Sequence, residues 1–118
     1  MSIRIVPSPT FSARVPFTVP GESEPAWIDF EFRHKAPEAL RAWLESRGDR
    51  SVSEALSDVV VRWKGGVIDE DGSEVVYSPA ALSVFLSAHA PRAQELARAY
   101  IAEITESRQK NSERLQSG

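Results

Sequence analysis

Polar and apolar residues alternate along two stretches near the start of the chain. Every second position is apolar in residues 11–19, and the same period of two recurs in residues 28–32. This pattern is typical of strands with one buried face. Pro16 has no amide hydrogen to donate, which places the first strand at a sheet edge. We expect an antiparallel hairpin across the loop PGESEP, and Ile3–Val6 is a candidate third strand.

The rest of the chain changes to helical spacing, in which apolar residues recur every three or four positions. Proline at a first helical position, capping serines and terminal glycines mark where the helices begin and end. Four helices are predicted: one from Pro37 that ends before Gly48, one from the Ser51–Glu54 capping box to Trp63, one from Ser78-Pro79 to Ala90, and one from Pro91 to Ile104.

The segment from Ser51 to Trp63 has the most regular helical pattern. Its apolar positions are Val52, Ala55, Leu56, Val59, Val60 and Trp63. Gly65-Gly66 would then end this helix. The following residues predict a small hairpin, because Asp71-Gly72 is a tight-turn sequence between two short apolar segments.

These elements predict an α+β fold, in which an N-terminal antiparallel hairpin of two or three strands packs against about four helices. An isolated hairpin is marginal in water, so the helices must cover its apolar face. We expect a single domain over residues 1–104. Residues 105–118 hold one strongly apolar residue, Leu115, and predict a helical extension that frays into a flexible polar tail.

Composition narrows the classes of function. The 118 residues are 42% hydrophobic and carry a net charge of −3, so strong attraction to nucleic acid is not expected. No segment approaches the roughly 18 continuous apolar residues of a membrane span. The absence of cysteine removes disulfides, thiolate metal sites and thiol nucleophiles. We expect a cytoplasmic protein that binds neither nucleic acid nor membranes.

No group of residues predicts catalysis, a metal or a cofactor. His34 lies among charged residues and His89 on the inner stripe of a short helix, and neither has a carboxylate at a supporting spacing. The acidic run Asp69–Glu74 does not fit a calcium-binding EF-hand loop, since aligning Gly72 with the loop glycine puts valine and serine at the terminal ligand positions. Gly65-Gly66 lacks the lysine and serine of a phosphate loop.

Trp27 is the most unusual aromatic residue, because it is out of phase with Ile28, Phe30 and Phe32 and should point to the outer face of the sheet. An outward tryptophan can contact a partner or pack beneath a neighbouring loop. Trp43 lies on a helical stripe, which predicts a core position.

The run from Arg33 to Tyr100 resembles the tail assembly chaperones of long-tailed phages. The resemblance rests on the order of a few packing and turn residues. They are Trp63, Gly66, Asp71-Gly72, Tyr77-Ser78-Pro79, Leu82, Leu86, Ala97 and Tyr100.

This resemblance implies a non-enzymatic factor that acts in the host cytoplasm. Such proteins bind the tape measure protein, protect its apolar helices from aggregation and bring tail tube protein to it; many are also made in a longer form by a translational frameshift. On this hypothesis an apolar groove near Trp27, Trp43 and Phe85 would hold the client. Self-association of the chain stays open.

Two other functions remain as alternatives. A structural tail completion or tube-associated protein would stay in the virion, whereas an assembly chaperone would not. A small hydrolase would depend on His34 or His89.

Overall fold

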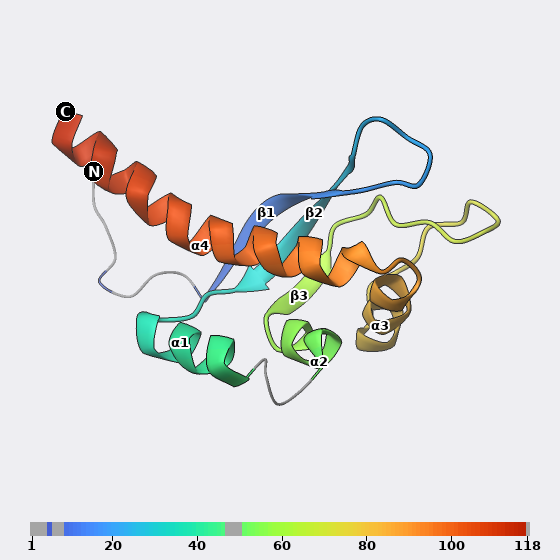
Figure 1. Cartoon of the computed structure of the whole chain (residues 1–118), viewed down its shortest axis with the longest axis horizontal. Coiled ribbons are helices and arrows are strands. Elements are labelled where there is room, and N and C mark those ends of the chain that lie inside the picture. Colours follow the sequence, from blue (N-terminus) through green and yellow to red (C-terminus); the bar gives the residue numbers. More distant parts are fainter. Residues whose placement is uncertain (1–4, 6–8, 47–50, 118) are drawn as a thin grey trace.

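The computed structural model describes residue 5, residues 9–46 and residues 51–117, with side chains as far as Thr105. The described part has an α+β fold, as predicted, with a three-stranded antiparallel sheet and four helices (Figure 1). The elements are β1 (Thr10–Phe17), β2 (Ala26–Arg33), α1 (Pro37–Ser46), α2 (Val52–Ser57), β3 (Val60–Trp63), α3 (Pro79–Ser87) and α4 (Pro91–Ser117).

The predicted hairpin is formed by β1 and β2. They pair over their full lengths, from Thr10 opposite Arg33 to Phe17 opposite Ala26. The strand order is β1-β2-β3, so β1 is an edge strand. This confirms the prediction that Pro16, which has no amide hydrogen, lies in an edge strand.

The prediction of one helix from Ser51 to Trp63 is wrong in its second half. The helix α2 begins as expected, with the Ser51 hydroxyl accepting a hydrogen bond from the Glu54 amide (3.1 Å), but it ends at Ser57. Residues Val60–Trp63 form β3, and Trp63 pairs with Phe30 of β2. Three consecutive valines favour a strand, and the hairpin gains the third strand that it needs for stability.

The other expected third strand, Ile3–Val6, lies outside the described residues except for Ile5, which is fully exposed. Because the segment before them is β3, Gly65 and Gly66 follow a strand and do not end a helix as predicted. Both have positive φ angles, of 95° and 86°. The predicted pairing across Asp71-Gly72 is present as one bridge between Ile68 and Glu74.

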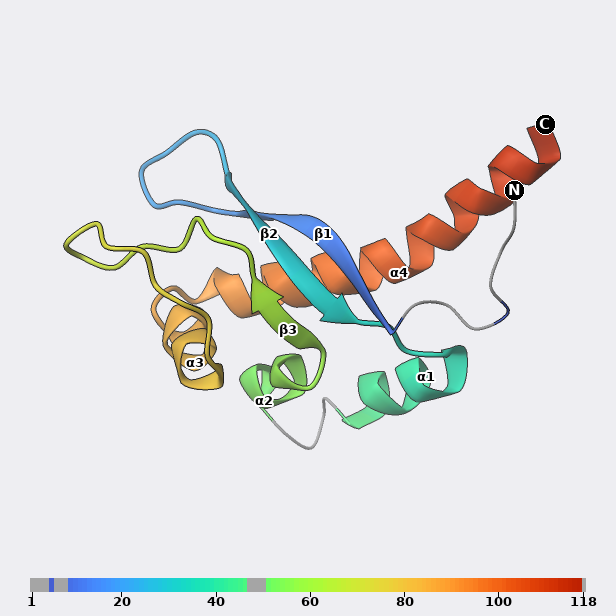
Figure 2. The same cartoon turned by 180° about the vertical axis from the view of Figure 1, so that it is seen from behind.

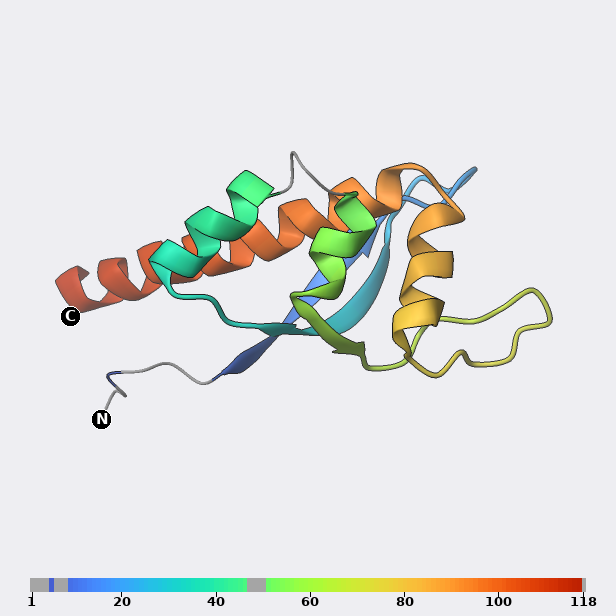
Figure 3. The same ribbon diagram turned by 90° about the horizontal axis from the view of Figure 1, so that it is seen from below.

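The helices cover one face of the sheet. Figure 3 shows α1, α2 and α4 together on that side, and α4 contacts β1, α2 and α3. Side chains of β1 and β2 alternate accordingly, with Val15, Phe30 and Phe32 fully buried while Arg14 and Asp29 on the opposite face are exposed. The outer face of the sheet is therefore mostly polar, with Trp27 as an exposed aromatic residue on it.

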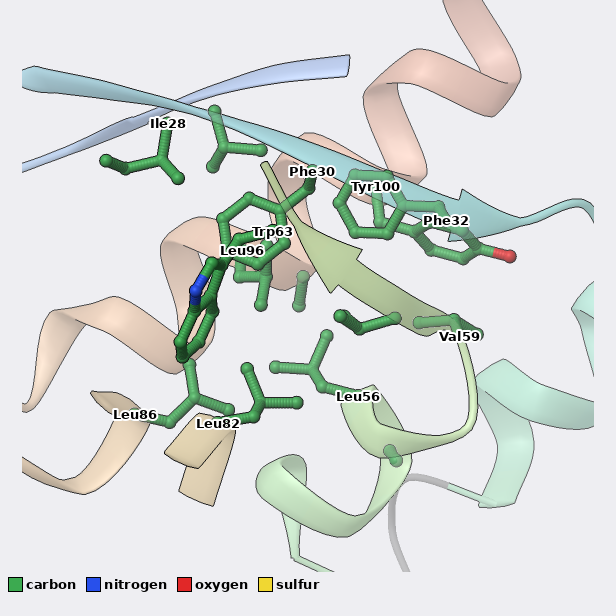
Figure 4. Close-up of a cluster of buried hydrophobic side chains, with 14 of the residues drawn as sticks. Ile28, Phe30, Phe32, Leu56, Val59, Trp63, Leu82, Leu86, Leu96 and Tyr100 are labelled. Carbon is green, nitrogen blue, oxygen red and sulfur yellow. The ribbon is translucent and has the colours of Figure 1, made fainter. Parts of the chain in front are cut away.

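Aromatic and leucine side chains fill the space between sheet and helices (Figure 4). Phe30 and Trp63 from the sheet meet Leu56 and Leu82 from the helices. Tyr100 of α4 is fully buried, and its hydroxyl donates a hydrogen bond to the carbonyl oxygen of Arg33 (2.9 Å). Burial raises the pKa of Tyr100 to about 12, because the phenolate would lose its hydration.

The last two helices begin where they were predicted. Ser78 caps α3, and Pro79 is its first residue. However, α3 ends at Ser87, so His89 lies in the turn before α4 and not within a helical stripe. The inner side of α4 carries Leu96, Ala97, Tyr100 and Ile104, which are buried.

One continuous helix runs from Pro91 to Ser117 (Figure 1). Its C-terminal part extends away from the sheet. The domain boundary at residue 104 and the fraying of the polar end stay predictions.

Candidate functional site

Phe85 of α3 lies at the border between the core and an open groove. Its ring is half-buried and meets Phe17 edge-to-face, with 5.1 Å between ring centroids. It also contacts Trp63 at 5.6 Å. The Arg92 guanidinium lies 4.5 Å from the ring centroid, and Arg92 Nη1 donates a hydrogen bond to the Phe85 carbonyl oxygen (3.1 Å). These contacts hold the ring firmly in place.

The groove beside Phe85 lies between α3 and the 64–78 loop. It encloses about 760 Å³ and we call it the Phe85 groove. Its apolar lining residues include Val67, Ile68, Ala81, Val84, Phe85 and Ala88. Ile68 and Val84 are 63% and 69% exposed, which is unusual for large aliphatic side chains. The groove therefore offers apolar surface that the fold itself leaves uncovered.

Three carboxylates, those of Asp69, Glu70 and Asp71, line the loop side of the Phe85 groove. Asp69 Oδ1 accepts hydrogen bonds from the amides of Asp71 (3.1 Å) and Ser73 (3.2 Å), and Asp71 Oδ1 accepts one from Ser73 (2.8 Å). Interaction with the Asp69 side chain and hydrogen bonds accepted from Ser73 lower the pKa of Asp71 to about 2. Asp71 thus stays ionised at any physiological pH.

Trp27 lines a second groove, between the edge of β1, the 18–25 loop and α4. We call this space, of about 540 Å³, the Trp27 groove. The predicted outward orientation of Trp27 is confirmed, since the residue is 53% exposed, and the Arg14 guanidinium lies 5.4 Å from its ring centroid. Across the groove, Glu95 of α4 accepts hydrogen bonds from the Thr18 amide (3.0 Å) and hydroxyl (2.6 Å).

Trp43 lies in neither groove. As the helical stripe predicted, it is a core residue, only 3% exposed, and its Nε1 donates a hydrogen bond to the carbonyl oxygen of Ala55 (2.8 Å). Its ring contacts Tyr100 edge-to-face at 5.3 Å. The structure thus separates the three sequence-based candidates, with Trp27 and Phe85 in different grooves and Trp43 beneath the surface. Contact of a partner with any of the three stays a prediction.

A comparison with family models identifies the chain. The model described as phage tail assembly chaperone matches residues 1–111. The chain belongs to this family. No curated protein and no solved structure matches it. The match includes the Arg33–Tyr100 run on which the resemblance rested and extends to the N-terminal hairpin.

Membership gives the chaperone protein partners in tail assembly, and the family is generally non-enzymatic. In the described part of the chaperone, no helix is long and apolar enough to cross a membrane. The same residues contain no cluster of three or more side chains suited to hold a metal ion. His89 Nε2 is buried without a hydrogen-bond partner among the described residues, and the His34 amide donates to the Pro9 carbonyl oxygen (2.8 Å) at the end of β2.

Two residues of the chaperone's Phe85 groove were missed by the sequence analysis. Val84 lies between the inward positions Leu82 and Phe85, and Ile68 lies next to the acidic turn. Both carry the signal that singled out Trp27, namely an apolar side chain out of phase with its neighbours. The two residues line one groove because the 64–78 loop folds over α3. The local spacing of apolar residues carries no information about that fold.

Proposed function

We propose that this chaperone binds the tape measure protein in the host cytoplasm, keeps its apolar helices from aggregating and helps to recruit tail tube subunits. Family membership supports the general role. The observation that carries the client-binding part is the Phe85 groove, where Ile68, Val84 and Phe85 face an open space. An amphipathic helix placed there would bury its apolar stripe against these side chains.

The position of the groove suits a temporary contact. Figures 1 and 2 show that the 18–25 and 64–78 connections extend from the same end of the molecule, opposite the C-terminal end of α4. A client can therefore bind at this end without displacing a core element. Such a surface suits a chaperone that must release its client.

Co-expression with tape measure fragments tests the location of the site. The double substitution Ile68→Gln/Val84→Gln removes exposed apolar surface from the groove without touching the core, so we expect less of the fragment to stay soluble. Val76→Gln is the matched control, because Val76 is 84% exposed and does not line the Phe85 groove. Unchanged solubility with the double variant would show that the client binds elsewhere.

Two further measurements complete the test. Trp27→Ala in the same assay determines whether the Trp27 groove also contributes to client solubility. Mass spectrometry of purified particles tests the transient role, since a chaperone is absent from the finished virion. Detection of the chain at the copy number of a structural protein would contradict the proposal.

A further inference from the structure

The two walls of the Phe85 groove differ in charge. The α3 wall presents Ala81, Val84 and Ala88, whereas the loop wall presents Asp69, Glu70 and Asp71 beside Ile68. Arg92 is the one cationic residue among the described lining residues, and its guanidinium is already held against the Phe85 ring and carbonyl oxygen. A bound helix would therefore have carboxylates along one side of its apolar stripe and neutral side chains along the other.

The loop carboxylates have no ion-pair partner within the described residues. Ion pairs among the described residues include Arg14 with Asp29 and Arg62 with Glu31, both on the outer face of the sheet. The side chains of Asp69, Glu70 and Asp71 are exposed, so they remain available to a charged client. We call these three residues the rim of the groove. Their position next to the exposed Ile68 means that one client helix can meet both the apolar and the acidic surface.

We infer that the Phe85 groove selects amphipathic client helices that carry lysine or arginine beside the apolar stripe, on the side that faces the 64–78 loop. The inference rests on the proposed function. Flanking lysine or arginine would pair with the rim while its aliphatic stem covers Ile68. Flanking glutamate at the same positions would be repelled, so the rim excludes equally apolar helices of the wrong charge.

Two synthetic helical peptides of about 20 residues test this selection. Both have the same apolar stripe; one carries lysine and the other glutamate at the flanking positions. We expect the parent protein to bind the lysine peptide about tenfold more tightly at low salt, the size that a few exposed ion pairs give together. The difference should shrink as ionic strength rises. Equal affinities at low salt would overturn the inference.

Variants with neutral side chains at the rim test whether its carboxylates cause the difference in peptide affinity. Asp69→Asn/Glu70→Gln/Asp71→Asn removes three charges but retains an oxygen acceptor at each position, and we expect the two peptides to bind it within about twofold of each other. Glu70→Gln alone leaves every hydrogen bond of the turn intact and should reduce the difference partially. A control of equal charge, Glu38→Gln/Glu45→Gln/Glu54→Gln, lies on α1 and α2 and should retain the full difference. A full difference in the rim variant would overturn the inference.

The groove itself is tested separately by Ile68→Gln/Val84→Gln. If this variant binds the lysine peptide as tightly as the parent protein does, the groove is not the site and both proposals fail. If it loses binding while the parent does not distinguish the two peptides, the groove stands and only the charge selection fails.

Discussion

Two of the three tryptophans are buried and join elements through their indole N–H groups, whereas the third is exposed. Trp43 connects α1 to α2 through the Ala55 carbonyl oxygen, and Trp63 connects β3 to the returning loop through the Val75 carbonyl oxygen (2.9 Å). Trp27 lies at the surface, with the Arg14 guanidinium 5.4 Å from its ring centroid. Replacing a buried indole removes a hydrogen bond and leaves a cavity, so the two buried indoles should matter more for stability than the exposed one.

We predict that Trp43→Phe lowers the free energy of unfolding by about 1–3 kcal/mol, because a cavity forms and the Ala55 carbonyl oxygen keeps only the longer hydrogen bond from the Asp58 amide (3.3 Å). Trp27→Phe is the control and should change it by less than about 0.5 kcal/mol, as expected for a surface position. Urea denaturation followed by far-ultraviolet circular dichroism measures both. Equal losses in the two variants would contradict the assigned environments.

At the scale of elements, the sequence predicted the hairpin and the starts of α1, α2, α3 and α4, because each depends on local alternation, capping or proline. It did not predict β3. The spacing of Val52, Leu56, Val59 and Trp63 fits one long helix and also fits a short helix followed by a strand. Pairing with β2 decides between them, and that partner lies outside the local window.

The candidate site was predictable to a similar degree. Trp27 could be placed on the outer face because strand alternation determines orientation, and Phe85 could be placed on α3. Their separation into two grooves could not be predicted, since it depends on the paths of the 18–25 and 64–78 loops. The positive φ angles of Gly21 (81°) and Gly66 (86°) help to set these paths.

These glycines offer a matched test of how the 64–78 loop docks. A side chain costs about 1–2 kcal/mol at a positive φ, and this strain applies to both positions. A Cβ at Gly66 would also lie 3.0 Å from Ile28 Cδ1, whereas one at Gly21 would meet nothing within 4 Å. We predict that Gly66→Ala destabilises the protein more than Gly21→Ala does, measured by thermal unfolding. Equal shifts would mean that the loop does not pack on Ile28.

At the scale of the whole molecule, both edges of the sheet are protected from pairing with another chain. The Pro9–His34 pair is hydrogen-bonded, and bonded and non-bonded pairs alternate along a hairpin, so the Pro16 nitrogen faces the free edge of β1. The next outward-facing amide, that of Thr18, already donates its hydrogen bond to the Glu95 carboxylate. At the opposite edge the Tyr77 hydroxyl reaches the Val60 carbonyl oxygen (3.5 Å). Self-association by strand addition is therefore disfavoured.

We predict that Pro16→Thr/Glu95→Ala increases self-association, because it restores an amide donor at residue 16 and frees the one at Thr18. Sedimentation velocity at matched concentrations should give a larger mean mass for this variant than for the parent protein. Pro16→Thr/Glu95→Gln is the control, since glutamine retains an acceptor for Thr18 and should limit the effect. No increase in the first variant would show that other features protect the edge.

Closure of the fold depends on contacts between distant parts of the sequence. Glu95 bonds Thr18 across 77 positions, and Tyr100 bonds Arg33 across 67. The hairpin leaves the ribosome long before α4 is synthesised. The aromatic face of the sheet is therefore exposed to solvent until α4 can pack against it. The nascent protein thus exposes aggregation-prone apolar surface of its own before it is folded and able to bind a client.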